Sequence, residues 1–223
     1  MSLRILDNIV QGTEEWHDQR RGMVTASVVG KLITATLKVA DNEVSRGLTA
    51  TLAAERITGH TDPVYVSDDM WRGVEDEPRA REKYAEHKGI EVEVVGFMVR
   101  DDWGFSIGYS PDGLVGDDGL IEVKSRLQKN HLRHIVNGEV PAENMAQLQA
   151  GLLVSGRKWI DYVSYCGGMP LWIKRVEPDE EWFDAILTAV DAFETNAWAM
   201  TDAFEKATKG LAQTERAIEL EMI

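Results

Sequence analysis

Three side chains in the middle of the sequence have types and spacing that suit chemistry: Asp112, Glu122 and Lys124. Asp112 stands in a turn segment, and the apolar segment that carries Glu122 and Lys124 follows a Gly-Asp-Asp-Gly turn. Side chains of a strand alternate between its two faces, so Glu122 and Lys124 are expected on one face and Val123 in the core. Because the tight turn makes the two segments a hairpin, the second strand is expected to return Glu122 to the side of Asp112.

Two carboxylates that converge at the end of a sheet form an oxygen-rich pocket suited to Mg²⁺ or Mn²⁺, and the backbone carbonyl of Val123 adds a further oxygen. A lysine beside such a pocket can orient or deprotonate a water, or neutralise a phosphate oxygen. This set therefore predicts metal-dependent hydrolysis of a phosphodiester, with one or two ions. The alternative is an exposed hairpin with an incidental ion pair between Glu122 and Lys124, and local sequence leaves both interpretations open.

The segments before this hairpin are predicted to be helical, and they must carry the side chains that complete the pocket. Thr13 is an N-cap for a helix that ends near Arg21-Gly22, since its hydroxyl can accept a hydrogen bond from the first turn. Pro78 either opens a later helix or kinks a longer one. The other predicted helices are one that starts at 25–27, a segment 45–57 and a segment 70–88 that ends at Gly89.

The middle of the chain is predicted to form a sheet because its apolar residues alternate. A helix is predicted at 142–155, and a long amphipathic helix from Asp179 onward. The order predicts a mixed α/β or α+β fold, as a single domain over 1–223 with 177–223 as an acidic helical tail. The predicted strands are 90–95, short strands within 97–109, then 114–115, 120–124, 159–165 and 171–176.

The formal charge of −14 is unevenly distributed along the 223 residues. Residues 177–223 hold 12 acidic and 3 basic residues, so the tail carries most of the excess. A bound divalent cation would offset carboxylate charge, so nucleic acid is allowed as a partner, whereas a broadly basic, non-specific binder is disfavoured. The single cysteine, Cys166, excludes an internal disulfide and an iron–sulfur cluster, and no apolar run is long enough for a membrane span. A cytoplasmic protein without a membrane partner is expected.

Ser110-Pro111-Asp112-Gly113 followed by Glu122-Val123-Lys124 resembles the PD-(D/E)xK nuclease motif. The flanking segments resemble the phage lambda exonuclease branch of that superfamily, the viral recombinase nucleases, from about Gln11 to Val154 and weakly to Val176. The resemblance implies a restriction-endonuclease-like core with a central mixed β-sheet flanked by helices. The further segments that carry it, in the same order, are Trp16-His17 with Arg20 and Gly22, Thr25-Ala26-Ser27, Trp71-Arg72-Gly73 with Glu77, Ala80 and Arg81, and Met145-Ala146-Gln147-Leu148-Gln149.

The resemblance also implies roles for the hairpin residues. Asp112 and Glu122 become the metal-binding carboxylates, the carbonyl of Val123 becomes a further ligand, and Lys124 activates the attacking water. Glu77 is implied to help bind a metal or its water. The plainer interpretation of Glu77, a charge favoured by a helix end, stays open at this point.

The remaining matches concern the substrate. Gln147 is implied to orient the nucleophile or a phosphate, and its alternative is an exposed helical amide. An arginine fork suits the terminal phosphate that the family binds, but Arg20 could equally form a surface ion pair with Glu14 or Glu15. The implied 5′-phosphate pocket consists of Arg20, Thr25, Ser27 and Ser110, of which Ser110 has turn formation as its alternative.

The activity that this resemblance implies is a Mg²⁺-dependent 5′ to 3′ exonuclease that degrades one strand of linear double-stranded DNA to mononucleotides. A phage or prophage origin, a single-strand-annealing recombinase as partner and a ring-shaped homotrimer follow from the same resemblance. The rivals are an endonuclease on the same core and a non-catalytic DNA-end-binding assembly subunit. Clustered carboxylates that face a phosphate argue against the second rival, because a protein that only bound DNA would not need them.

Two weaker features are interpreted as structural. His131 and His134 lie three residues apart, and a solvated, helical segment is favoured for them over a metal site. The aromatic residues of the tail are assigned to the core or to a subunit interface. They are Trp182, Phe183, Phe193, Trp198 and Phe204.

Overall fold

The computed structural model describes residues 2–63 and 65–216, and within them seven α-helices, one short 3₁₀ helix and eight strands. The helices are α1 (Glu14–Arg20), α2 (Ala26–Val29), η1 (Gly30–Leu32), α3 (Glu43–Thr58), α4 (Asp68–Lys88), α5 (Gln128–Asn137), α6 (Ala142–Ser155) and α7 (Glu180–Ala207). The strands are β1 (Leu3–Leu6), β2 (Val24–Thr25), β3 (Phe97–Arg100), β4 (Ile107–Tyr109), β5 (Gly113–Val115), β6 (Gly119–Ser125), β7 (Trp159–Tyr165) and β8 (Trp172–Val176).

The strands form two four-stranded sheets, in the orders β1-β3-β4-β2 and β5-β6-β7-β8. Each sheet is mixed, because β2 pairs with β4 and β6 with β7 in parallel while the other pairs are antiparallel. The helices α5 and α6 connect β6 to β7, as the crossover between two parallel neighbours requires. The predicted mixed α/β class is confirmed. The resemblance implied one central sheet, whereas the structure has two.

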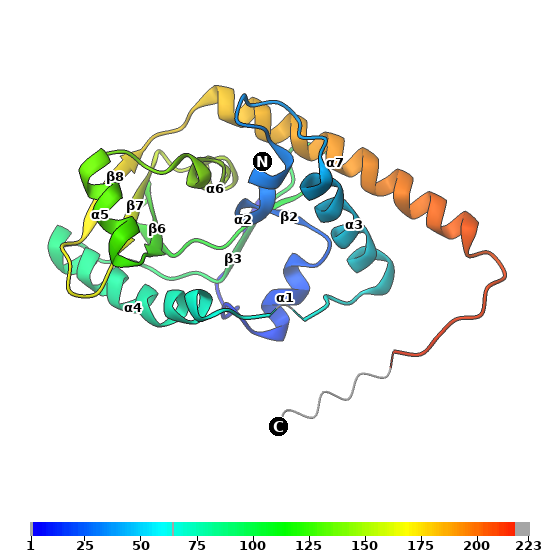
Figure 1. Cartoon of the computed structure of the whole chain (residues 1–223), viewed down its shortest axis with the longest axis horizontal. Coiled ribbons are helices and arrows are strands. Elements are labelled where there is room, and N and C mark those ends of the chain that lie inside the picture. The colour runs from blue at the N-terminus through cyan, green and yellow to red at the C-terminus, as the bar shows by residue number, and fades with distance from the viewer. Residues whose placement is uncertain (1, 64, 217–223) are drawn as a thin grey trace.

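Helices cover both faces of the second sheet (Figure 1). Alternation along β6 sends Ile121 and Val123 toward α4, where they form a small core with Ala80 and Tyr84. The opposite face, with Leu120, belongs to the main core, to which α2, α3, α6 and α7 contribute. The prediction that Val123 points into the core is therefore confirmed, and Glu122 is left facing α6.

Local signals account for the helix boundaries. The Thr13 hydroxyl accepts a hydrogen bond from the Trp16 amide at the start of α1, and Asn42 and Ser45 form a capping box at the start of α3. Helix α4 begins at Asp68 after the N-cap Ser67, slightly earlier than predicted, and runs through Pro78 to a left-handed Gly89. Of the two interpretations of Pro78, the longer helix is the one observed.

Three predictions of secondary structure were wrong or incomplete. The alternating segment 90–95 is not a strand, because only Glu93 pairs, in an isolated bridge with Leu114, while Val94 lies exposed. Strands β1 and β2 were not predicted: β1 pairs with β3, and β2 pairs with β4. The tail is helical only to Ala207: the described residues 208–216 are not helical, and 217–223 lie outside the described part of the chain.

The prediction that His131 lies in a solvated segment is wrong. Its side chain is fully buried on α5. Its ring nitrogens make hydrogen bonds with the Ser164 hydroxyl at 2.8 Å and the Pro170 carbonyl at 2.9 Å. Both contacts join α5 to the β7–β8 region, so the histidine serves packing. Among the tail aromatics Phe193 is buried, whereas Trp198 is exposed. No helix of the described residues has both the length and the apolar character needed to cross a membrane.

Candidate active site

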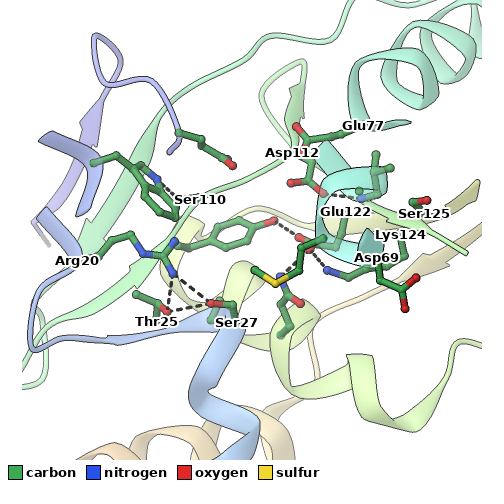
Figure 2. A pocket seen from close by; sticks show the side chains of 18 residues that line it. Arg20, Thr25, Ser27, Asp69, Glu77, Ser110, Asp112, Glu122, Lys124 and Ser125 are labelled. Carbon is green, nitrogen blue, oxygen red and sulfur yellow. Dashed lines mark hydrogen bonds and ion pairs between the residues drawn. The ribbon is translucent and has the colours of Figure 1, made fainter. Parts of the chain in front are cut away.

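A cavity of about 480 Å³ opens where α1, β2, α4, β6 and α6 meet (Figure 2). All ten residues that the sequence suggested for the site line this one cavity, although they come from segments far apart in the chain. They are Arg20, Thr25, Ser27, Glu77, Ser110, Asp112, Glu122, Val123, Lys124 and Gln147. The cavity has a carboxylate-rich side around β6 and an arginine–hydroxyl side around α1 and β2.

The β5–β6 hairpin positions the first carboxylate. Gly113 pairs with Ile121, so Asp112 lies opposite Glu122 at the mouth of the hairpin. One oxygen of Asp112, Oδ2, accepts a hydrogen bond of 2.6 Å from the backbone N–H of Val123. A side chain at Gly113 would collide with Val92, which explains the glycine after the aspartate. The N–H and C=O of one strand residue point to the same side, so the carbonyl of Val123 also faces Asp112.

Glu122 is almost fully buried, and three donors hold its carboxylate. Its Oε1 accepts hydrogen bonds from Lys124 Nζ at 2.7 Å and from Gln147 Nε2 at 2.6 Å. Its Oε2 accepts one from the Tyr109 hydroxyl at 3.3 Å. Gln147 is thus not the exposed amide of the alternative interpretation. Tyr109 is a site residue that the sequence did not reveal, since its buried position on β4 reads as ordinary core.

Negative charge dominates this side of the cavity. Burial, together with the charges of Glu122 and Glu77, raises the pKa of Asp112 well above its usual value. Burial also raises the pKa of Glu77, with Arg81 opposing the shift. Burial lowers the pKa of Lys124, but the carboxylates of Glu122 and Asp112 outweigh it and the pKa is raised. The ionised carboxylates therefore repel one another, and one lysine offsets them only in part.

Glu77 reaches the cavity from the middle of α4, so it is not a helix-terminal charge. Arg81, one turn further along α4, forms an ion pair with Glu77 and donates a hydrogen bond of 2.7 Å to the backbone carbonyl of Asp112. One arginine therefore ties the helix to the loop that carries the aspartate. The described residues include no ready cluster of three or more His, Cys, Asp or Glu side chains around one metal position.

The donor set nevertheless fits a divalent cation. Asp112, Glu122 and the Val123 carbonyl offer hard oxygens of the kind that Mg²⁺ and Mn²⁺ prefer. Each carboxylate oxygen has two lone pairs, so the hydrogen bonds to Asp112 and Glu122 leave acceptor capacity. The pKa of Asp112 is raised by burial and by the charges of Glu122 and Glu77, and a cation would offset the repulsion from those two charges.

The opposite side of the cavity is suited to an anion. The Arg20 guanidinium stacks 3.8 Å from the centre of the Trp16 ring and donates to the hydroxyls of Thr25 at 3.5 Å and Ser27 at 3.3 Å. The Trp16 indole N–H donates to the Ser110 hydroxyl at 2.9 Å. Burial lowers the pKa of Arg20 to about 10, with Glu55 opposing the shift, so the arginine is charged at neutral pH.

In the described part of the chain no ion pair joins Arg20 to Glu14 or Glu15, so the surface-pair alternative is not observed. Trp16 was part of the matched motif, but its contacts with Arg20 and Ser110 were not foreseen. A second polar group at the cavity rim was also missed: Ser125 donates to Asp76 at 2.7 Å and accepts from Arg72 at 3.1 Å. These two contacts of Ser125 cannot be predicted from local sequence, because each joins the end of β6 to α4.

The chain has relatives that cover this site. Residues 15–158 match the model of the YqaJ-like viral recombinase domain, a span that contains all ten sequence-suggested residues of the cavity. No curated protein matches the sequence.

Solved structures match nearly the whole chain. An alkaline exonuclease from Laribacter hongkongensis, LHK-Exo, is 34% identical, covers 90% of this chain and 100% of its own, and superposes with a TM-score of 0.80. Its complex with dAMP gives the same identity and coverage with a TM-score of 0.79. A phage-related exonuclease from Haemophilus somnus 129PT shares the fold, at 13% identity, 82% of this chain, 96% of its own and a TM-score of 0.64. These matches confirm the predicted nuclease-like fold.

Proposed function

The chain belongs to the YqaJ-like viral recombinase family, and on that premise we propose that it is a metal-dependent exonuclease that degrades one strand of linear double-stranded DNA from its 5′ end to mononucleotides. The observation that carries the proposal is that one cavity holds both a carboxylate–lysine side and an arginine–hydroxyl side. The first suits the scissile phosphate and the second a terminal phosphate. The related alkaline exonuclease was crystallised with dAMP, a mononucleotide of the kind such a reaction would release.

Asp112, Glu122 and the Val123 carbonyl would hold Mg²⁺ or Mn²⁺, as one or two ions, with Glu77 in support. When bound, the metal supplies a Lewis acid that polarises the scissile phosphate. Lys124 is assigned to the attacking water or to a phosphate oxygen, and its ammonium is held beside Glu122 for that purpose. Gln147, which shares an oxygen of Glu122 with Lys124, is assigned to orient the nucleophile.

Arg20 is assigned to the 5′-terminal phosphate, with the hydroxyls of Thr25, Ser27 and Ser110 around it. A guanidinium fork and hydroxyl donors are suited to several phosphate oxygens at once. Binding the end of the strand in this pocket would place the next phosphodiester toward the carboxylates. That arrangement favours an exonuclease over an endonuclease.

The setting of the enzyme is also a proposal. Membership of a viral recombinase family supports a phage or prophage protein that acts in the cytoplasm of a bacterial host. Double-stranded DNA ends are its proposed substrate, and the 3′ single strands that it would leave suit a strand-annealing recombinase as partner. The homotrimeric ring and the single-domain organisation stay predictions.

The proposed activity is tested with linear duplex DNA labelled separately at its 5′ and 3′ ends, with and without a 5′ phosphate. We expect Mg²⁺-dependent release of 5′ mononucleotides, faster with the phosphate and abolished by EDTA. A closed circular duplex serves as the control, and it should survive. Cuts inside the circle, or binding without release in Mg²⁺ and Mn²⁺, would contradict the proposal and point to an endonuclease or to an end-binding subunit.

Replacement of Arg20 tests the anion side of the cavity. Arg20→Gln should lower the preference for a 5′-phosphate over a 5′-hydroxyl end by roughly 10-fold or more, since it removes a charge-assisted donor pair. The ratio of kcat/KM on the two ends is the measurement. Arg46→Gln, which removes an exposed arginine paired with Asp41, is the matched control. An unchanged ratio in the Arg20 variant would remove Arg20 from the pocket.

A further inference from the structure

The turn at Gly22 links the two parts of the anion side of the cavity, and α3 grips it by both backbone groups. Arg20 lies just before the turn, and Thr25 and Ser27 lie just after it. The Gly22 N–H donates a buried hydrogen bond of 2.7 Å to Glu55 Oε2, and the Gly22 carbonyl accepts one of 2.6 Å from Arg56 Nε. Two consecutive residues of α3 therefore bind the backbone N–H and C=O of the same residue, Gly22.

Gly22 is required for this grip. Its φ of +66° lies in the left-handed region that favours glycine, and a Cβ at this position would collide with the Cγ of Arg56. The backbone of the turn thus passes directly against the arginine side chain. A shift of the Arg56 side chain would therefore displace the backbone of the turn, because the two are in direct contact.

Helix α7 holds Arg56 in turn. Glu194 accepts two hydrogen bonds from the Arg56 guanidinium, from Nη1 at 2.6 Å and from Nη2 at 2.7 Å. This bidentate pair is partly buried, with side-chain exposures of 34% for Arg56 and 27% for Glu194, and the guanidinium also lies 5.2 Å from the ring centre of Phe193. In Figure 1, α3 and α7 lie side by side along the edge of the molecule.

We infer that Glu55, Arg56 and Glu194 are positioning residues for the recognition of a 5′-terminal phosphate, and that α7 thereby takes part in the choice of DNA end. The inference rests on the proposed function and deepens it. Arg20 reaches its hydroxyl partners at 3.3 and 3.5 Å, at the long end of hydrogen-bond distances, so a small shift of the turn opens them. A phosphate that bridges the guanidinium and the hydroxyls needs both in place.

Because Glu194 lies outside the cavity, its replacement should affect the choice of DNA end without affecting the chemical step. Glu194 does not line the cavity, so its loss leaves the carboxylates and Lys124 untouched. We expect Glu194→Ala to lower the preference for a 5′-phosphate over a 5′-hydroxyl end by roughly 10-fold, with kcat on 5′-hydroxyl DNA unchanged. Glu194→Gln keeps one acceptor for Arg56 and should show a smaller loss.

The experiment compares the full-length wild type, Glu194→Ala, Glu194→Gln and the matched control Asp202→Ala, which removes another paired acid from α7. Two readouts are taken: kcat and KM on both DNA ends in Mg²⁺, and Kd for both ends in EDTA, where turnover is blocked. All measurements are made below the melting temperature of the least stable variant. A selective loss of 5′-phosphate preference in the Glu194 variants, with Asp202→Ala like wild type, supports the inference.

Two results would overturn it: an unchanged preference in Glu194→Ala, or an equal loss on both DNA ends. The second would mean that the ion pair only stabilises the fold. A failure of the proposed function is visible separately, in the wild type, as no release of nucleotides or no preference for the phosphate.

Discussion

Asp112→Asn is expected to abolish DNA cleavage, with a fall in kcat of roughly 1,000-fold or more, while DNA binding is preserved or tightened. The asparagine keeps an oxygen that can accept the hydrogen bond from the Val123 N–H, so the hairpin should retain its geometry. What is lost is a negative oxygen donor of the proposed metal site. What is gained is relief from burying a charge beside like charges, because burial first, and then the charges of Glu122 and Glu77, raise the pKa of Asp112.

The same change makes a prediction about stability. Without metal, the Asp112→Asn protein should melt at the same temperature as wild type or higher, since a buried charge among like charges has been neutralised. Asp117→Asn, in the exposed turn of the same hairpin, controls for the substitution itself. Thermal unfolding in EDTA, a gel-shift assay and single-turnover cleavage together test the prediction. Cleavage at the wild-type rate by the Asp112 variant would sink the assignment of the metal site.

The hairpin was predictable because its residues are close in sequence. Alternation and a tight turn suffice to bring Glu122 and Lys124 to one face and Asp112 opposite Glu122. Arg20, Glu77 and Gln147 come from separate segments, so only the family resemblance predicted that they would line the same cavity. Their position in the cavity supports the roles assigned to them but does not test those roles.

Other features could not be foreseen because they depend on partners far away in the chain. The alternation of 90–95 has the period of a strand, but a strand also needs a neighbour, and only Glu93 finds one. The local sequence does not show the roles of Tyr109 and Glu194, since the pattern around Tyr109 is typical of a core strand and that around Glu194 of a solvated helix face. Their hydrogen-bond partners, Glu122 and Arg56, are set by how β4 and α7 pack.

Replacement of Lys124 should separate catalysis from metal binding. Lys124→Ala is expected to lower kcat by roughly 100-fold while the Mg²⁺ concentration for half-maximal activity changes little, because the lysine is assigned to the water or phosphate and not to the metal. The variant should also be less stable, since it leaves the buried Glu122 carboxylate without its cation. Lys158→Ala, an exposed lysine paired with Asp118, is the matched control. Equal losses of turnover and of metal affinity would instead make Lys124 a support for the carboxylates alone.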